Sequence, residues 1–184
     1  MQGVRFAVID IGTVTTRLLV ADCSAERIRD VARRVTMTQL GAGMQPSGRL
    51  QRAAIERVGH TVESYLDIVR SCEDADGIER ASTCVIAIAT SAARDASNAD
   101  ELLARLEACG VALAIIPGAQ EARLSFRGTT SAFPEAMRPL VVDIGGGSTE
   151  VSLGDTRSQT IELSRSFNIG CRRVTDRFLV DDPP

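Results

Sequence analysis

The chain has 184 residues, of which 44% are hydrophobic and 24% charged, and its formal net charge at pH 7 is −3. This length can form one sizeable core or two small ones, and the acidic balance argues against general binding to nucleic acid or membrane surfaces. All 21 basic residues are arginine, which excludes the P-loop and Schiff-base enzymes that need a lysine.

No apolar stretch approaches the ~18 residues of a membrane span, since even the longest, Cys84–Ala89 and Val111–Ile116, are far shorter. The N-terminus lacks a basic segment followed by an apolar one, so no secretory signal is expected. The five cysteines are scattered and odd in number, which favours reduced thiols over a disulfide framework. We therefore expect a cytoplasmic protein.

The first part of the chain predicts a sheet and a long helix. Residues 4–11 and 15–22 read as a β-hairpin, and 26–38 as a third, more exposed strand. Apolar residues at helical spacing predict an amphipathic helix over about 49–72. Residues 82–89 then read as a buried strand.

The elements that follow complete an α/β lobe. Asn98 is expected to cap a helix that Gly110 ends, 111–116 reads as a strand, and a further helix is expected over about 119–132. The order of strands and helices predicts a mixed β-sheet with helices packed on it, because parallel neighbours need crossover helices.

From Leu140 the pattern starts again, with a second hairpin, a strand near 159–164 and a helix near Gly170. We therefore expect a complete first lobe over residues 1–133 and the start of a second lobe over 134–184. An unpaired strand edge and uncovered apolar residues would favour a homodimer or other self-association, and a half-built lobe would hydrolyse substrate poorly. The uncovered residues expected here are Val141, Val151 and Leu153.

The two hairpins are copies of one unit, because Val8–Val20 and Val141–Leu153 share the same pattern. Each is an apolar run ending in Asp, then a turn of Gly, Ser or Thr, then a second strand. Such turns offer backbone N–H groups and hydroxyls to a phosphate, and the neighbouring Asp can hold Mg²⁺ or its waters. Two such turns facing each other would clamp a metal–phosphate ligand.

Four segments, in this order and spacing, resemble the exopolyphosphatase and guanosine pentaphosphate phosphatase family, within the superfamily of actin, sugar kinases and Hsp70. The resemblance covers essentially the whole chain. It implies a ribonuclease H-like, actin-like ATPase lobe and a Mg²⁺-dependent hydrolase that removes terminal phosphate from polyphosphate or guanosine pentaphosphate. The segments are Ile9–Thr13, Ala89–Ala96, Ile116–Arg123 and Asp143–Glu150.

The resemblance also implies roles for single residues. Glu121 matches the catalytic glutamate that orients or deprotonates the attacking water, and Asp143 would hold Mg²⁺ with help from Glu150; Asp10 is the equivalent acid of the first hairpin. Hydroxyls next to Arg94 also suit a phosphate. The expected phosphate-binding residues are Gly12, Thr13, Thr15, Arg17, Thr90, Ser91, Arg94, Gly145, Gly146, Gly147 and Ser148.

Simpler readings stay open for several of these residues. Glu121 can merely complement a helix dipole, and Arg94 can be a structural ion-pair partner. Two positions also depart from the family pattern: Val14 replaces the usual Asn in the first turn, and Gln120 replaces the first acid of a Glu-Glu pair. The first departure removes one polar donor to phosphate.

Other function classes fit the sequence less well. Haloacid-type phosphatases need a second Asp at the position of Gly12, and the two Cys-x5-Arg stretches, which begin at Cys23 and Cys171, lie on a strand and a helix rather than a phosphate loop. The main alternative is a non-catalytic module that senses polyphosphate or guanosine alarmones. Glu121 favours the enzyme, whereas Val14 and the unfinished second lobe favour the sensor.

Overall fold

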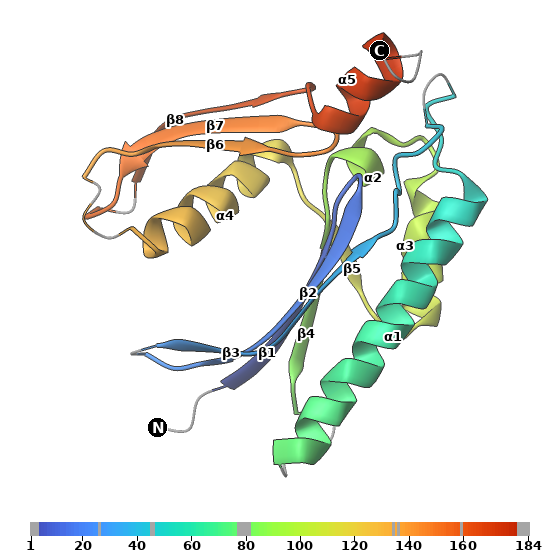
Figure 1. The fold of residues 1–184 in the computed structure, drawn as a ribbon, viewed down its shortest axis with the longest axis horizontal. Helices are drawn as coiled ribbons and strands as arrows, with labels where there is room; N and C mark the ends of the chain where they lie inside the picture. Colours follow the sequence, from blue (N-terminus) through green and yellow to red (C-terminus); the bar gives the residue numbers. More distant parts are fainter. Residues whose placement is uncertain are drawn as a thin grey trace. The chain divides into compact units, whose positions relative to one another are not determined.

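The computed structural model describes residues 4–25, 27–44, 47–76, 82–133, 135, 137–158 and 160–179. Contacts divide the chain into two compact units, 1–115 and 116–184 (Figure 1). Each unit contains one copy of the repeated hairpin.

The first unit is a five-stranded mixed sheet with helices. In the sheet order β3-β2-β1-β4-β5, β1 is antiparallel to β2 and parallel to β4, which is in turn parallel to β5. The elements are β1 (Val4–Ile11), β2 (Thr15–Cys23), β3 (Ile28–Met37), α1 (Arg52–Asp76), β4 (Cys84–Ala89), α2 (Ser91–Asp95), α3 (Ala99–Ala108) and β5 (Leu113–Ile115).

The core of this unit lies between the sheet and α1 and α3. Every second residue of β1 is buried, and α1 contributes a stripe at helical spacing. The α1 stripe is Ala54, Ile55, Val58, Val62, Tyr65 and Val69. The predicted hairpin and the predicted amphipathic helix are therefore confirmed, with the helix running from Arg52 to Asp76.

Arg105 of α3 fastens the two helices to each other. Its guanidinium bonds Glu56 and Glu63 of α1, both at 2.9 Å, and these bonds raise the pKa of Arg105 and lower that of Glu63. Gly59 makes room for the contact, because a Cβ there would stand 2.3 Å from the guanidinium carbon.

Two local expectations for this unit need correction. Asn98 does precede α3, but its side chain bonds the N–H and C=O of Leu50, at 2.8 and 3.1 Å, instead of capping the helix. Strand β4 is only partly buried, because Cys84, Val85 and Ile86 are exposed. Gly110 follows the end of α3 with a φ of 78°, as its position predicted.

The second unit is a three-stranded antiparallel sheet, in the order β6-β7-β8, with one helix packed on it. Its last helix follows β8 directly. The elements are α4 (Gly118–Ser131), β6 (Leu140–Ile144), β7 (Thr149–Asp155), β8 (Thr160–Phe167) and α5 (Cys171–Phe178).

Helix α4 belongs to the second unit. Its residues Ala122, Phe126 and Thr130 are buried, and Phe126 lies so close to Gly154 of β7 that a Cβ there would be 2.7 Å from the ring. The boundary drawn by contacts therefore falls before α4, whereas the sequence placed the end of the first lobe at residue 133. Val141 was expected to be uncovered, but it faces this helix and is only 8% exposed.

The repeat seen in the sequence is also a structural repeat. Ile11 pairs with Thr16 across the first hairpin, and Ile144 pairs with Thr149 across the second. The second strand of each hairpin meets the third with a register shift, after Val20 in one unit and after Leu153 in the other. Both positions are ten residues after the Asp that precedes the turn, so the copies match beyond the turn itself.

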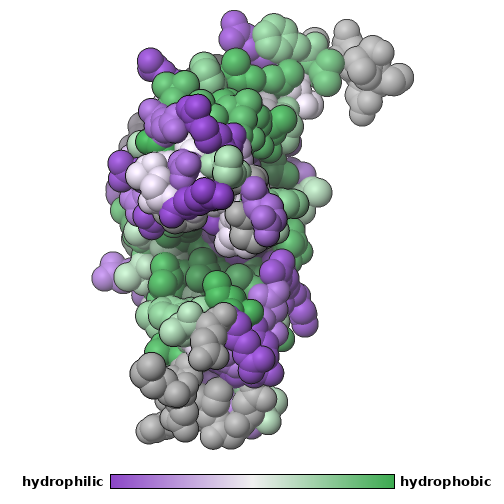
Figure 2. Space-filling model, turned by 90° about the vertical axis from the view of Figure 1, so that its left-hand side faces the viewer, coloured by the Kyte–Doolittle hydropathy of each residue, from purple (hydrophilic) through white to green (hydrophobic). Residues whose placement is uncertain are grey.

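Large apolar side chains are exposed in both units, and Figure 2 shows hydrophobic areas between hydrophilic ones at the surface. On β6 and β8 the exposed ones are Leu140, Val142, Ile144, Leu163 and Phe167. Among the described residues, no helix combines the length and apolarity that crossing a membrane requires.

Candidate functional site

The segment that follows β3 forms hydrogen bonds with the first turn, Gly12–Thr15. The Gly12 N–H donates to the Thr15 carbonyl at 2.9 Å. The carbonyl of Thr13 accepts a bond from the Gly41 N–H, and that of Val14 accepts bonds from two N–H groups. These two donors belong to Thr38, at 3.0 Å, and Gln39, at 2.8 Å.

The second turn, Gly145–Ser148, has the same internal bond and the same kind of support. The Gly145 N–H donates to the Ser148 carbonyl at 2.9 Å. Backbone N–H groups at the start of α5 donate to the carbonyls of Gly145 and Gly146, at 2.9 to 3.2 Å. These donors are the N–H groups of Cys171, Arg172 and Arg173.

This support fixes the direction of the N–H groups in the second turn. In a trans peptide the C=O and the following N–H point in opposite directions. Because the carbonyls of Gly145 and Gly146 point toward α5, the N–H groups of Gly146 and Gly147 point away from it. Within the described part of the chain, no hydrogen bond takes up these N–H groups. Successive free backbone N–H groups form an anion-binding concavity.

The segment after β4 lies against the first turn. The Thr90 N–H donates to the Ile11 carbonyl at 3.3 Å, and Thr90 precedes the short helix α2. A Cβ on Gly41 would contact both Thr13 and Ala92 of α2, so the turn and the helix are neighbours. The Ser91 hydroxyl is one of two buried side-chain groups in the described ranges without a hydrogen-bond partner.

The acids beside the two turns have different neighbours. Asp10 lies across the strand pair from Arg17, whereas Asp143 lies across from Glu150. Opposed residues of an antiparallel pair share a face, with Cβ atoms about 4.5 to 5.5 Å apart, and two like charges there destabilise the sheet. Glu150 is 2% exposed and accepts a bond from the Ser166 hydroxyl at 2.8 Å.

This pair of carboxylates fits a divalent cation. Mg²⁺ is usually held by one or two carboxylates and by substrate phosphates, and it keeps several waters. Asp143 and Glu150 would supply two such ligands next to the second turn. No cluster of three or more acids, His or Cys that could hold a metal occurs in the described ranges, so phosphate oxygens and water would have to complete the coordination.

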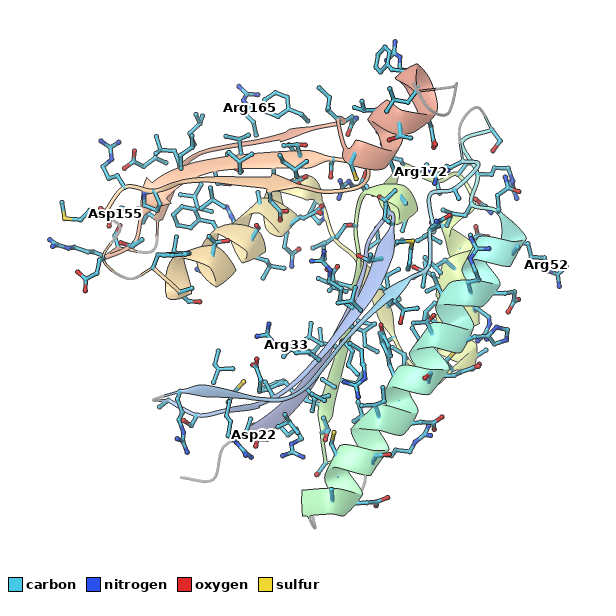
Figure 3. All side chains as sticks on the ribbon, viewed as in Figure 1. Asp22, Arg33, Arg52, Asp155, Arg165 and Arg172 are labelled. Atoms are coloured by element: carbon cyan, nitrogen blue, oxygen red, sulfur yellow. The ribbon has the colours of Figure 1, made fainter. Side chains whose placement is uncertain are left out.

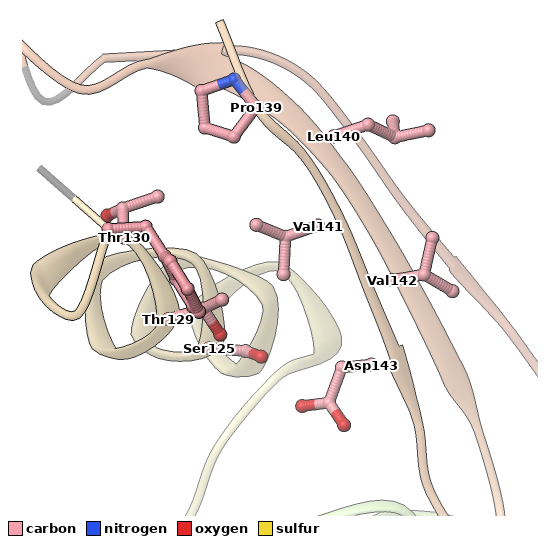
Figure 4. Close-up of a pocket in the computed structure, with 9 residues that line it drawn as sticks. Ser125, Thr129, Thr130, Pro139, Leu140, Val141, Val142 and Asp143 are labelled. Atoms are coloured by element: carbon pink, nitrogen blue, oxygen red, sulfur yellow. The ribbon is translucent and has the colours of Figure 1, made fainter. Parts of the chain in front are cut away.

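Glu121 stands in the first turn of α4 and is half-buried. The helix and β6 enclose an open pocket of about 540 Å³, in which Ser125 and Asp143 lie at the same end (Figure 4). Glu121 is one helical turn before Ser125 and therefore on the same face. Glu121 and Asp143 both lie in the second unit.

The predicted site residues fall into two groups. The first unit brings together Asp10, the first turn with Arg17 beside it, and the segment from Thr90 to Arg94; the second brings together Glu121, Asp143, Glu150 and the second turn. Sequence reasoning missed the residues behind the turns, among them Gly41, Gly170 and Arg173. Their contacts join segments about 25 residues apart, and no periodicity predicts them.

Comparison with known proteins decides the family. The model of the Ppx/GppA phosphatase family matches residues 19–184. The chain belongs to the Ppx/GppA phosphatase family. It is 39% identical over 195 residues to a protein named Exopolyphosphatase 2 from Mycobacterium tuberculosis, covering 100% of this chain and 58% of that protein.

Solved structures agree with this family. An exopolyphosphatase from Cytophaga hutchinsonii has 35% identity and a TM-score of 0.84, with 97% of this chain and 55% of that one covered. The Ppx/GppA enzyme of Aquifex aeolicus has 31% identity and a TM-score of 0.77, with 98% and 57% covered. The predicted actin-like α/β fold is thereby confirmed. The Ppx/GppA chain described here spans slightly more than half the length of these relatives.

Proposed function

We propose that the protein is a Mg²⁺-dependent phosphoanhydride hydrolase that releases terminal phosphate from inorganic polyphosphate or guanosine pentaphosphate. One observation carries the proposal: the second unit combines outward N–H groups in the second turn, an opposed pair of carboxylates and the half-buried Glu121. Transfer of a phosphoryl group to water needs just these elements, namely donors, a cation site and a base that aligns the water.

The second turn, Glu121 and the two carboxylates have separate tasks in this mechanism. The N–H groups of the second turn bind the oxygens of the terminal phosphate, and their bonds strengthen as negative charge spreads over those oxygens. Glu121 accepts a hydrogen bond from the attacking water and takes its proton. Asp143 and Glu150 would hold Mg²⁺, which neutralises phosphate charge.

The first unit offers a second set of groups suited to phosphate. Its first turn offers N–H groups and the hydroxyls of Thr13 and Thr15, and Arg17 adds an exposed positive charge. The buried Ser91 hydroxyl is a further donor. We propose that these groups also bind phosphate.

Location and association are also part of the proposal. We propose a cytoplasmic protein that associates with itself through the exposed apolar residues of β6 and β8, of which Ile144 is 70% exposed. Light scattering tests the association, which should weaken when Ile144 and Leu163 are replaced by Thr, a residue suited to strands.

The test of function compares catalysis with binding. Phosphate release from polyphosphate and from guanosine pentaphosphate is measured with Mg²⁺ in a protein extended to the length of its relatives, beside equilibrium binding of both. Release from either substrate supports the enzyme and identifies the preferred one. Tight binding without release supports instead the sensor that Val14, in place of a polar residue in the first turn, also favours.

A further inference from the structure

The segment after the third strand supports the turn in both units, by equivalent contacts. In the first unit the Thr16 hydroxyl bonds the Thr38 hydroxyl at 2.9 Å; in the second the Thr149 hydroxyl donates to the Ile169 carbonyl at 2.5 Å. Thr16 and Thr149 are both four residues after the Gly that opens their turn. The hairpin repeat therefore includes the anchoring of this segment.

A glycine in each segment packs directly on the turn. A Cβ on Gly41 would be 2.5 Å from the Thr13 side chain, and a Cβ on Gly170 would be 2.5 Å from the Gly146 carbonyl. Thr13 and Gly146 occupy the same position in their turns. Close support by a residue without a side chain is thus common to the two copies.

The two copies differ at the third turn residue. In the first turn the Val14 carbonyl accepts its bonds from backbone N–H groups. In the second turn the equivalent carbonyl, that of Gly147, accepts a bond from the side chain of Arg173, whose Nε donates at 2.9 Å. The carbonyl of the third turn residue therefore accepts its hydrogen bond from a guanidinium in the second copy and from backbone N–H groups in the first.

This bond decides the direction of one more N–H group. The Gly147 carbonyl and the Ser148 N–H belong to the same peptide plane and point in opposite directions. While Arg173 holds the carbonyl toward α5, the Ser148 N–H joins those of Gly146 and Gly147 in pointing away from it. Glycine has wide backbone freedom, so without such a bond the Gly146–Gly147 pair can adopt other conformations.

We propose that Arg173 is a positioning residue that sets the conformation of the second turn for phosphate binding. It acts through the Gly147 carbonyl and not by touching the phosphate. The inference rests on the proposed function, in which the second turn binds the terminal phosphate. It extends that function to a residue on α5, outside both hairpins.

The neighbouring Arg172 supplies a matched control. Its Nε bonds Asp176 one turn along α5 at 2.9 Å, and it lies at the start of that helix (Figure 3). Arg172→Met and Arg173→Met remove the same charge from adjacent positions. Any general electrostatic effect on anion binding is therefore similar in the two variants, and only the second loses the bond to the turn.

The experiment measures the amide NMR spectrum of the 184-residue chain and its titration with tripolyphosphate. Arg173→Met is expected to shift the amide signals of Gly146, Gly147 and Ser148 in the ligand-free chain. It is also expected to weaken tripolyphosphate binding on the order of tenfold, which corresponds to losing about one charge-assisted hydrogen bond, that from the Ser148 N–H to the anion. Arg172→Met is expected to leave these signals in place and to change binding less than twofold.

A second variant covers the case in which the Arg173→Met chain does not fold. Arg173→Lys keeps the charge but puts a methylene group where the Nε of Arg173 stands, so it is expected to weaken tripolyphosphate binding as well. In a protein extended to the length of its relatives, both Arg173 variants should raise KM for polyphosphate and also lower kcat, because the bonds from the second turn strengthen in the transition state.

The outcomes separate this inference from the proposed function. Unchanged signals of the turn in the Arg173 variants, or losses of affinity equal to those of Arg172→Met, would overturn the positioning role. A wild-type chain that does not bind tripolyphosphate would contradict the proposed function, whereas the ligand-free amide signals would still decide whether Arg173 holds the turn.

Discussion

Gly154 tests how α4 is docked on the second sheet. A Cβ at this position would stand 2.3 Å from the Thr160 carbonyl oxygen and 2.7 Å from the Phe126 ring. Both neighbours must move, because the first is backbone of β8 and the second is completely buried. Gly154→Ala is therefore expected to destabilise the protein by about 1 to 3 kcal/mol, the usual cost of overpacking.

Gly128 of α4 is the matched control. A Cβ there would have nothing within 4 Å, and alanine in a helix interior is more stable than glycine by about 0.5 to 1 kcal/mol. The same Gly→Ala substitution is thus expected to lower stability at one position of this unit and to raise it at the other. For a chain of this size, ~1 kcal/mol corresponds to about 2 to 4 °C in Tm.

Scanning calorimetry measures both variants, and hydrogen exchange locates the change. Gly154→Ala should lower Tm and speed exchange in β7, β8 and α4, and Gly128→Ala should raise Tm. Because α4 carries Glu121, the first variant should also lose turnover in the extended protein. A Gly154→Ala chain as stable as wild type would refute the packing described between Phe126 and Gly154.

Three further predictions concern charge, the first turn and the metal. Hydrogen bonds from Arg5 hold the pKa of Asp22 at about 2, below its ordinary 3.8. The contribution of Asp22 to the free energy of unfolding, at most about 2 kcal/mol before solvent screening, is therefore complete above about pH 5 and is lost as the pH falls toward 2. Asp22→Asn should remove this pH dependence from the free energy of unfolding measured by urea denaturation. Val14→Asn should tighten tripolyphosphate binding by roughly 0.5 to 1.5 kcal/mol in calorimetric titration, if its amide adds one net hydrogen bond. Asp143→Asn should raise the Mg²⁺ concentration needed for half-maximal phosphate release, and Asp10→Asn should raise it less; equal, unchanged titrations would exclude both acids as metal ligands.

Much of the local structure follows from the sequence because its causes are local. An apolar run that ends in Asp, followed by a turn of Gly, Ser or Thr, defines each hairpin, and the spacing of apolar residues defines α1. The repeat also predicted which acid lies beside each turn, since register follows from the turn. These features need no knowledge of distant segments.

The remaining features depend on contacts between distant residues. The apolar stripe of α4 predicts that the helix packs on a sheet but does not predict on which one. In the structure it packs on the second sheet, where Phe126 lies directly against Gly154. Asn98 has a side chain suited to capping, yet Leu50, 48 residues away, takes its hydrogen bonds. The bond from Arg173 to Gly147 likewise depends on the path of the chain after β8.

The central claim is that Glu121 activates the attacking water. Its most direct test is phosphate release by Glu121→Gln in a protein extended to the length of its relatives, together with polyphosphate binding by the same variant. Turnover should fall by a factor on the order of 10² to 10⁴, the usual contribution of a general base, while affinity stays within about twofold because the side chain keeps its shape. A variant that retains more than half of the wild-type rate would contradict the mechanism.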